Sequence, residues 1–225
     1  IRVLASLSSD MIPGFPRLNQ STIIVAPARA AITRTLPRRD FIQATRAVKK
    51  GQMIPLGELA WEWVQCGYEP SSVVIAPGQF ARRGGILDIW PPGDRFPARL
   101  EFFGDEVEML RRFDPETQRT IEHFESLLVT PAREYLLPSG KNHTHTQHKH
   151  YLEYHIPLLH TSQATLLNYL PKNSLVLVDD ITILRETIRE IDKLATSLRK
   201  GYLKEGSLSE SYPRPYLTWK EFQES

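Results

Sequence analysis

Arginine and aromatic side chains, which often recognise protein partners, gather between Pro97 and Phe113 of the 225-residue chain. Alternation with a period of two places Arg99, Glu101 and Phe103 on one face of a predicted strand. An arginine can donate charge-assisted hydrogen bonds to carboxylates, and a large aromatic on the same polar face is typical of a binding hot spot. The alternative is that Phe103 covers a second small core, because phenylalanine is usually buried.

Further cationic residues stand close to this segment. Arg82 and Arg83 precede Gly84-Gly85, where glycine permits a sharp bend, and Arg111 follows on the predicted returning strand. These residues predict an interaction patch built from arginine and aromatic side chains. The residue pattern alone does not identify its partner.

Sequence signatures of catalysis are not found. The nearest approach to a phosphate-binding Gly-x-x-x-x-Gly-Lys-Ser/Thr loop, Gly140-Lys141, lacks the earlier glycine. Asp180 could end a magnesium-holding strand, but we predict that it caps the N-terminus of a helix. Cys66 has no histidine near it in the sequence, and no Gly-x-Ser-x-Gly motif occurs. We therefore expect a non-enzymatic chain that needs no cofactor.

A polar tract runs from Pro138 to His150 and has the composition of a linker. Its four histidines could chelate zinc or nickel adventitiously. No cysteine or carboxylate framework surrounds them, so we expect no dedicated metal site. The histidines are His143, His145, His148 and His150.

The composition is that of an ordinary globular protein, with 41% hydrophobic residues and a formal net charge of +2. A single cysteine suits a reducing compartment, and no stretch reaches the roughly 18 apolar residues of a membrane span. We therefore expect a cytoplasmic location and no membrane partner. The chain starts at Ile1 without an initiator methionine, which suggests a piece of a longer protein.

The first segment is rich in arginine and poor in acidic residues. These arginines could bind phosphate or an acidic partner, or they could simply form a solvated face. Only Asp10 and Asp40 oppose the cations. The arginines are Arg2, Arg17, Arg29, Arg34, Arg38, Arg39 and Arg46.

Hydrophobic periodicity predicts strands alternating with helices. One helix follows Pro55 and ends at Gly67, and Trp61 lies off its apolar stripe, so this tryptophan meets another layer or is partly exposed. A second helix follows Asp180 and ends at Gly201. An antiparallel hairpin turns at Gly104. The predicted strands are Thr22–Ala26, Val73–Ala76, Ile86–Trp90, Ala98–Phe103, Val107–Phe113 and Leu175–Val178.

These elements predict a multidomain α/β and α+β fold, in which a β-rich, mixed-sheet subdomain lies between parts of two α/β subdomains. Composition changes near Lys49-Lys50-Gly51 and Pro138 mark the boundaries. The expected ranges are 1–47, 48–135 and 136–225.

The central segment resembles the bacterial transcription-repair coupling factor family. The N-terminal module of that family is homologous to UvrB, the helicase subunit of nucleotide excision repair, and the string Phe113 to Thr120 favours the coupling factor over UvrB. The flanks agree more weakly with the first and third subdomains of the module. The matching strings are Gly78 to Pro91, Arg99 to Glu106 and Arg111 to Thr120.

The resemblance implies that the middle subdomain recruits UvrA, the damage-recognition ATPase, and does not itself hydrolyse ATP. By motif position, the UvrA contacts of the family fall on Arg83, Arg99 and Phe103, and we expect Arg82, Glu101 and Arg111 to support them. The full-length family members also engage RNA polymerase and DNA. A C-terminal domain masks the UvrA surface in them, so we expect the present chain to bind UvrA without inhibition.

Two rival functions remain open from the sequence. The arginine-rich first segment favours a DNA-binding fragment of a UvrB-type helicase subunit. An ATPase, or UvrB itself, is the weaker rival, because the phosphate loop and an aromatic-rich DNA-clamping hairpin are not found here.

Overall fold

The computed structural model describes residues 1–8, 11–12, 23–136, 156–160, 164–206 and 208–225. The chain divides by packing into two compact units. Unit 1 comprises residues 1–18 and 39–151, and unit 2 comprises residues 19–38 and 152–225. The predicted end ranges, 1–47 and 136–225, therefore each contribute to both units. The three-part division of the sequence stays a prediction.

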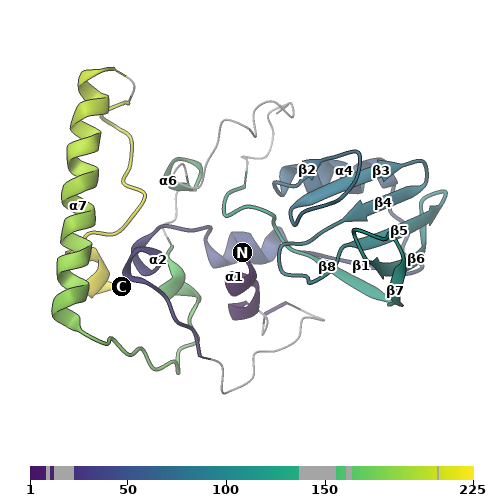
Figure 1. The fold of residues 1–225 in the computed structure, drawn as a ribbon, viewed down its shortest axis with the longest axis horizontal. Coiled ribbons are helices and arrows are strands. Elements are labelled where there is room, and N and C mark those ends of the chain that lie inside the picture. The colour runs from purple at the N-terminus through teal and green to yellow at the C-terminus, as the bar shows by residue number, and fades with distance from the viewer. Residues whose placement is uncertain (9–10, 13–22, 137–155, 161–163, 207) are drawn as a thin grey trace. The chain divides into compact units, whose positions relative to one another are not determined.

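Unit 1 holds all of the described strands. A six-stranded sheet has the order β2-β3-β4-β5-β6-β7, with β2 and β3 parallel and every other pair antiparallel, and β1 pairs with β8 in a separate two-stranded sheet (Figure 1). The strands are β1 (Arg46–Lys49), β2 (Glu69–Pro70), β3 (Gln79–Arg83), β4 (Ile86–Ile89), β5 (Ala98–Phe103), β6 (Glu106–Phe113), β7 (Thr120–His123) and β8 (Ser126–Val129). Helices α1 (Arg2–Leu7), α3 (Arg38–Gln43) and α4 (Leu56–Gln65) accompany them.

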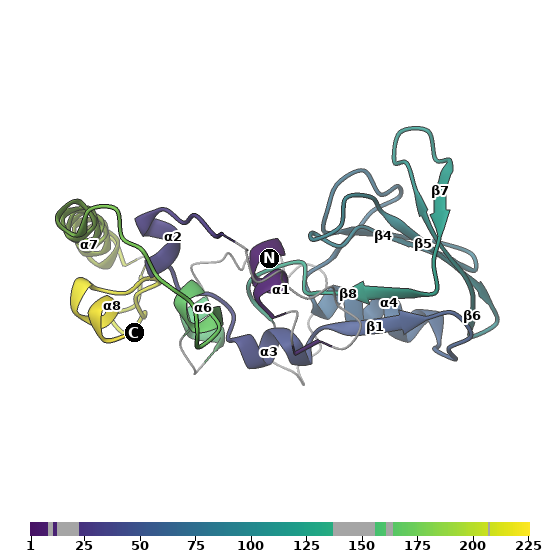
Figure 2. The ribbon, with the colours of Figure 1, turned by 90° about the horizontal axis from the view of Figure 1, so that it is seen from below.

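The core of unit 1 lies between helix α4 and one face of the six-stranded sheet (Figure 2). The predicted apolar stripe of α4 is confirmed, because Leu59 and Trp63 are completely or almost completely buried against Leu87 and Leu100 of the sheet. Trp61 lies off this stripe and is 60% exposed. The face of the six-stranded sheet that points away from α4 is called the outer face below.

Helix α4 ends in a Schellman motif, as the predicted stop at Gly67 requires. Gly67 has a φ of +85°, and its N–H donates to the carbonyl of Val64 at 3.0 Å. The N–H of Tyr68 donates to the carbonyl of Trp63 at 2.9 Å. The glycine thus lets the chain leave the helix and enter β2.

The predicted hairpin is confirmed. Strands β5 and β6 pair antiparallel from Ala98↔Arg112 to Phe103↔Glu106, and Gly104, with a φ of +63°, starts the two-residue turn between them. The register shifts between Glu101 and Phe102, so Glu108 is an extra residue on β6. Beyond this bulge, Phe102 still faces the core and Phe103 still faces outward.

Unit 2 is built around two packed helices, α2 (Ala28–Ile32) and α7 (Ile181–Lys204) (Figure 1). Ile32, Ile188 and Leu217 form a small buried cluster within it. Asp180 caps α7 as predicted, with its carboxylate accepting from the N–H groups of Thr182 and Ile183. The remaining elements are α6 (Ile156–Leu159), the 3₁₀ helix η2 (Leu166–Tyr169) and α8 (Trp219–Glu224).

Three predicted strands are wrong over their described residues. Ile23 and Val25 belong to no strand and are 87% and 91% exposed, and Thr22 lies outside the described residues. The run from Leu175 to Val178 is likewise unpaired and exposed. An apolar run becomes a buried strand only beside neighbouring strands, and none pairs with these segments in the part of the chain that the structure describes. Val73–Ala76 is an irregular loop that buries only Val74.

Helix α7 departs from its prediction in two ways. It continues through Gly201 to Lys204, because helix propensity on both sides outweighs one glycine, and the left-handed glycine is Gly206, with a φ of +69°. Its apolar stripe is only partly covered. Ile188 is buried, whereas Leu194 and Leu198 are 64% and 52% exposed. Among the described residues, no helix is both long and apolar enough to cross a membrane.

Candidate protein-interaction site

Strand register places five of the six predicted site residues on the outer face. Arg83 pairs with Ile86, Asp88 with Arg99, and Arg99 with Arg111, and directly paired residues share a face. Glu101 and Phe103 follow Arg99 by alternation. Arg82 pairs with the buried Leu87 and so belongs to the opposite face, although it is itself exposed.

Asp88 lies at the centre of this face and is 1% exposed. Arg99 holds it with two hydrogen bonds, from Nε to Oδ1 at 2.6 Å and from Nη2 to Oδ2 at 2.8 Å. Arg83 donates from Nη2 to the same Oδ2 at 2.7 Å. These bonds to Asp88 raise the pKa of Arg99. One buried carboxylate therefore anchors two guanidinium groups, and the cluster keeps one positive charge in excess.

The two arginines differ in what they offer to a partner. The Arg99 side chain is 10% exposed, and its guanidinium also lies over the Phe113 ring at 4.5 Å from the centroid. The Arg83 side chain is 48% exposed. Arg83 thus presents its guanidinium to solvent, whereas Arg99 mainly holds the cluster together.

The loop between β6 and β7 covers Arg99. Arg99 Nη2 donates to Oε1 of Gln118 at 2.8 Å, and Gln118 is a non-glycine residue with a positive φ, 60°. Asp114 shapes this loop by accepting from the N–H groups of Glu116 and Thr117, at 3.0 and 2.8 Å. The bonds from Thr117 lower the pKa of Asp114. The string that resembles the coupling factor therefore forms a loop that fixes Arg99.

Glu101 and Arg111 bind each other. Arg111 Nε donates to Oε1 of Glu101 at 2.8 Å, and Arg111 Nη1 donates to the hydroxyl of Thr120 at 2.6 Å. Both charged side chains are partly buried. The pair supports the outer face beside Arg99 and leaves little free charge there.

Phe103 is 78% exposed, so the alternative that it covers a second small core is wrong. It is the last paired residue of β5, opposite Glu106, and directly precedes the tight Gly104 turn, so strand pairing holds the backbone that carries it. A large exposed aromatic ring on an ordered hairpin is a candidate anchor for a partner protein.

Sequence reasoning missed Asp88 and Gln118. Asp88 had a signal, because a carboxylate between Leu87 and Ile89 on a buried strand needs a cationic partner. Gln118 had none, since its contact with Arg99 spans 19 residues and depends on the loop conformation.

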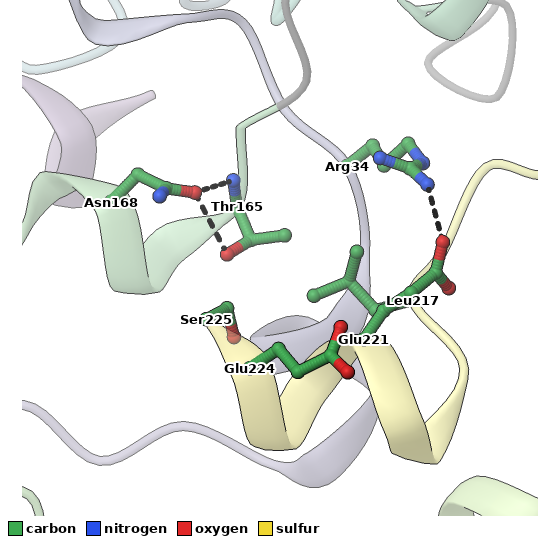
Figure 3. A pocket seen from close by; sticks show the side chains of 7 residues that line it. All are labelled: Arg34, Thr165, Asn168, Leu217, Glu221, Glu224 and Ser225. Carbon is green, nitrogen blue, oxygen red and sulfur yellow. Dashed lines mark hydrogen bonds and ion pairs between the residues drawn. The ribbon is translucent and has the colours of Figure 1, made fainter.

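A cavity of about 260 Å³ lies within unit 2 (Figure 3). Arg34, which is buried, donates from Nε to the carbonyl of Arg214 at 2.9 Å and pairs with Glu221 at 3.5 Å. The guanidinium group of Arg34 is therefore already bound by groups of unit 2. The cavity is lined by Arg34, Thr165, Asn168, Leu217, Glu221, Glu224 and Ser225.

No group of three histidine, cysteine or carboxylate side chains that could hold a metal ion occurs among the described residues. The tract with His143, His145, His148 and His150 lies outside them, as does Gly140-Lys141. Cys66 is a free thiol whose Sγ contacts the carbonyl oxygen of Ala44 at 3.6 Å.

Residues 47–135 match the family model of the UvrB interaction domain. This range contains the six-stranded sheet, helix α4 and every predicted site residue, so the similarity to that domain extends over the β-rich part of the chain. The match begins one residue before the predicted central range, 48–135.

The relatives found by sequence include transcription-repair-coupling factors and UvrABC system protein B, which confirms the resemblance drawn from the motifs. The transcription-repair-coupling factor of Bacillus subtilis is 29% identical over 227 residues, which cover 84% of this chain and 19% of that protein. The corresponding factor of Escherichia coli is 34% identical over 116 residues, which cover 52% and 10%. The UvrABC system protein B of Kosmotoga olearia is 32% identical over 124 residues, which cover 55% and 19%. The chain thus spans less than a fifth of the length of these relatives.

Proposed function

We propose that this chain is a protein-interaction module of a transcription-coupled DNA repair factor, that it recruits UvrA, and that it has no ATPase activity of its own. The observation that carries the proposal is the exposure of Phe103 on a rigid hairpin beside the excess positive charge at Arg83. The UvrB interaction domain and the similarity to coupling factors support a role in DNA repair.

The mechanism assigns different tasks to the three predicted contact residues. Phe103 fills an apolar pocket on UvrA, and Arg83 donates charge-assisted hydrogen bonds to an acidic group beside it. Arg99 acts mainly through Asp88, by fixing the cluster from which Arg83 projects. Substitution of Arg99 is therefore a poor test of contact, since it also removes a buried ion pair.

The test is a calorimetric titration of the chain with purified UvrA at two salt concentrations. We expect Phe103→Ala to weaken binding at least about tenfold, as truncation of a hot-spot residue does. We expect Arg83→Ala to weaken it most at low salt, because salt screens an exposed charge. Trp61→Ala is the matched control, because it removes an exposed aromatic from helix α4, on the other side of the sheet.

Equal affinities of the Phe103→Ala and Trp61→Ala variants would contradict the placement of the site. Binding to duplex DNA with a steep salt slope, and not to UvrA, would favour the rival DNA-binding function. Two arginines of the first segment count against that rival. Arg34 pairs with Glu221 and Arg46 with Glu62.

A further inference from the structure

The outer face continues past Phe103 onto a segment that the motifs did not single out. Residues 51–54 run beside the start of β6: Gly51 N–H donates to the Val107 carbonyl, Val107 N–H to that of Gln52, and Ile54 N–H to that of Asp105, at 2.8 to 3.0 Å. An isolated antiparallel bridge joins Met53 to Glu106. This segment therefore adds one more strand-like neighbour to the hairpin.

The register places Phe103, Glu106 and Met53 in one row across the sheet. Phe103 pairs with Glu106 and Glu106 with Met53, and directly paired residues point to the same side. Ile54, the next residue, is 2% exposed and faces the core, whereas Met53 is 68% exposed. Two strand spacings, about 10 Å, separate Phe103 from Met53. One partner surface can cover both apolar side chains.

The charges at this end of the sheet are divided across Phe103. On the β3–β4 side, Arg83, whose side chain is 48% exposed, precedes the turn that leads to Ile86. On the β6 side, Asp105 and Glu106 are exposed, and the side chains of Glu106 and Met53 form no hydrogen bond or ion pair with the described part of the chain. A partner that fits this end must place acidic groups against the first side and basic groups against the second.

We propose that Met53 and Glu106 extend the docking surface: Met53 is a second apolar anchor, and Glu106 pairs with a basic side chain of UvrA. This inference rests on the proposed function and adds the orientation in which the partner docks. Charges of opposite sign on the two sides of Phe103 fix one orientation, since the reversed complex would oppose like charges.

The test measures UvrA affinity by calorimetry for Met53→Ala, Glu106→Lys and Phe103→Ala, each at two salt concentrations. We expect Met53→Ala to weaken binding about threefold to tenfold at both salt concentrations, because an apolar contact is not screened. We expect Glu106→Lys to weaken it at least about tenfold at low salt and less at high salt. Glu190→Lys, an exposed position on α7 in unit 2, controls for the change in net charge.

The outcomes separate this inference from the proposed function. If Phe103→Ala loses affinity while Met53→Ala matches the wild type and Glu106→Lys matches Glu190→Lys, the extension is overturned and the proposed function stands. If the wild-type chain does not bind UvrA, both fail together. We expect equal urea midpoints for all variants, because the three positions are exposed. Equal midpoints exclude unfolding as the cause of a lost affinity.

Discussion

Asp88 is the carboxylate on which two predicted contact arginines converge, and its removal should affect folding before binding. In Asp88→Ala the Arg99 guanidinium would stay buried over Phe113 without its ionic partner. We expect a loss of about 3–5 kcal/mol in the free energy of unfolding, typical of one partner removed from a buried pair. Urea unfolding followed by tryptophan fluorescence measures it.

Glu116→Ala is the control for that experiment. Glu116 is an exposed carboxylate in the loop that covers Arg99, and its side chain binds nothing in the described part of the chain. We expect a change within about 0.5 kcal/mol. A similarly small change for Asp88→Ala would mean that the cluster does not hold the outer face together.

Cys66 gives a prediction about pH. Burial, and then the nearby Glu62 carboxylate, raise the pKa of its thiol to about 11, from an ordinary 9.0. Because only the thiolate reacts with a disulfide reagent, the folded chain at pH 8 should react roughly 100-fold more slowly than the chain in urea. The raised pKa also means that this group favours folding below pH 9 and that the contribution is lost as the pH rises toward 11. Equal reaction rates in the two states would contradict the burial of the thiol.

At the scale of elements, the end of α4 allows the effect of one glycine on stability to be measured. Gly67 adopts a left-handed conformation, and a Cβ there would lie 2.5 Å from Cγ of Arg133. We expect Gly67→Ala to lower the free energy of unfolding by about 1–3 kcal/mol, from the left-handed backbone and from displacement of Arg133. Gly57 lies in the same helix with nothing within 4 Å of an added Cβ.

Gly57→Ala should therefore stabilise the chain, by about 0.5–1 kcal/mol, since alanine is the better helix former. Thermal unfolding of the two variants, followed by circular dichroism, compares them directly. Shifts of the same sign would show that the Schellman motif does not control the end of α4.

Local elements could be predicted from the sequence because their determinants are local. The hairpin through Gly104, the stripe of α4 and the cap at Asp180 each depend on residues a few positions apart. The strand predictions at Ile23 and Leu175 were wrong because periodicity shows what a segment could bury, not which strands lie beside it.

The candidate site was predictable in part for the same reason. Alternation found Arg99 and Phe103, but the hydrogen bonds that hold Arg99 come from Asp88 and Gln118, 11 and 19 residues away.

At the scale of the whole molecule, each unit has its own core, and the two cores differ in size. Among the described residues, the large cluster of unit 1, from Val48 to Val129, has sixteen buried members, whereas the cluster of Ile32, Ile188 and Leu217 in unit 2 has three. Unit 2 also leaves apolar residues of α7 and of the run at Leu175 exposed. Since buried apolar area is the main favourable term in folding, unit 2 should be the less stable unit.

We therefore expect urea to unfold the chain in two steps, unit 2 first. Trp219 reports on unit 2, and the other three tryptophans, Trp61, Trp63 and Trp90, report on unit 1. Ile188→Ala, which empties a completely buried site in unit 2, should lower the first midpoint alone. Leu100→Ala, equally buried in the sheet, should lower the second alone. A single transition that both variants shift would mean that the two cores unfold cooperatively, and the proposed docking of UvrA on the sheet would then also stabilise the helices of unit 2.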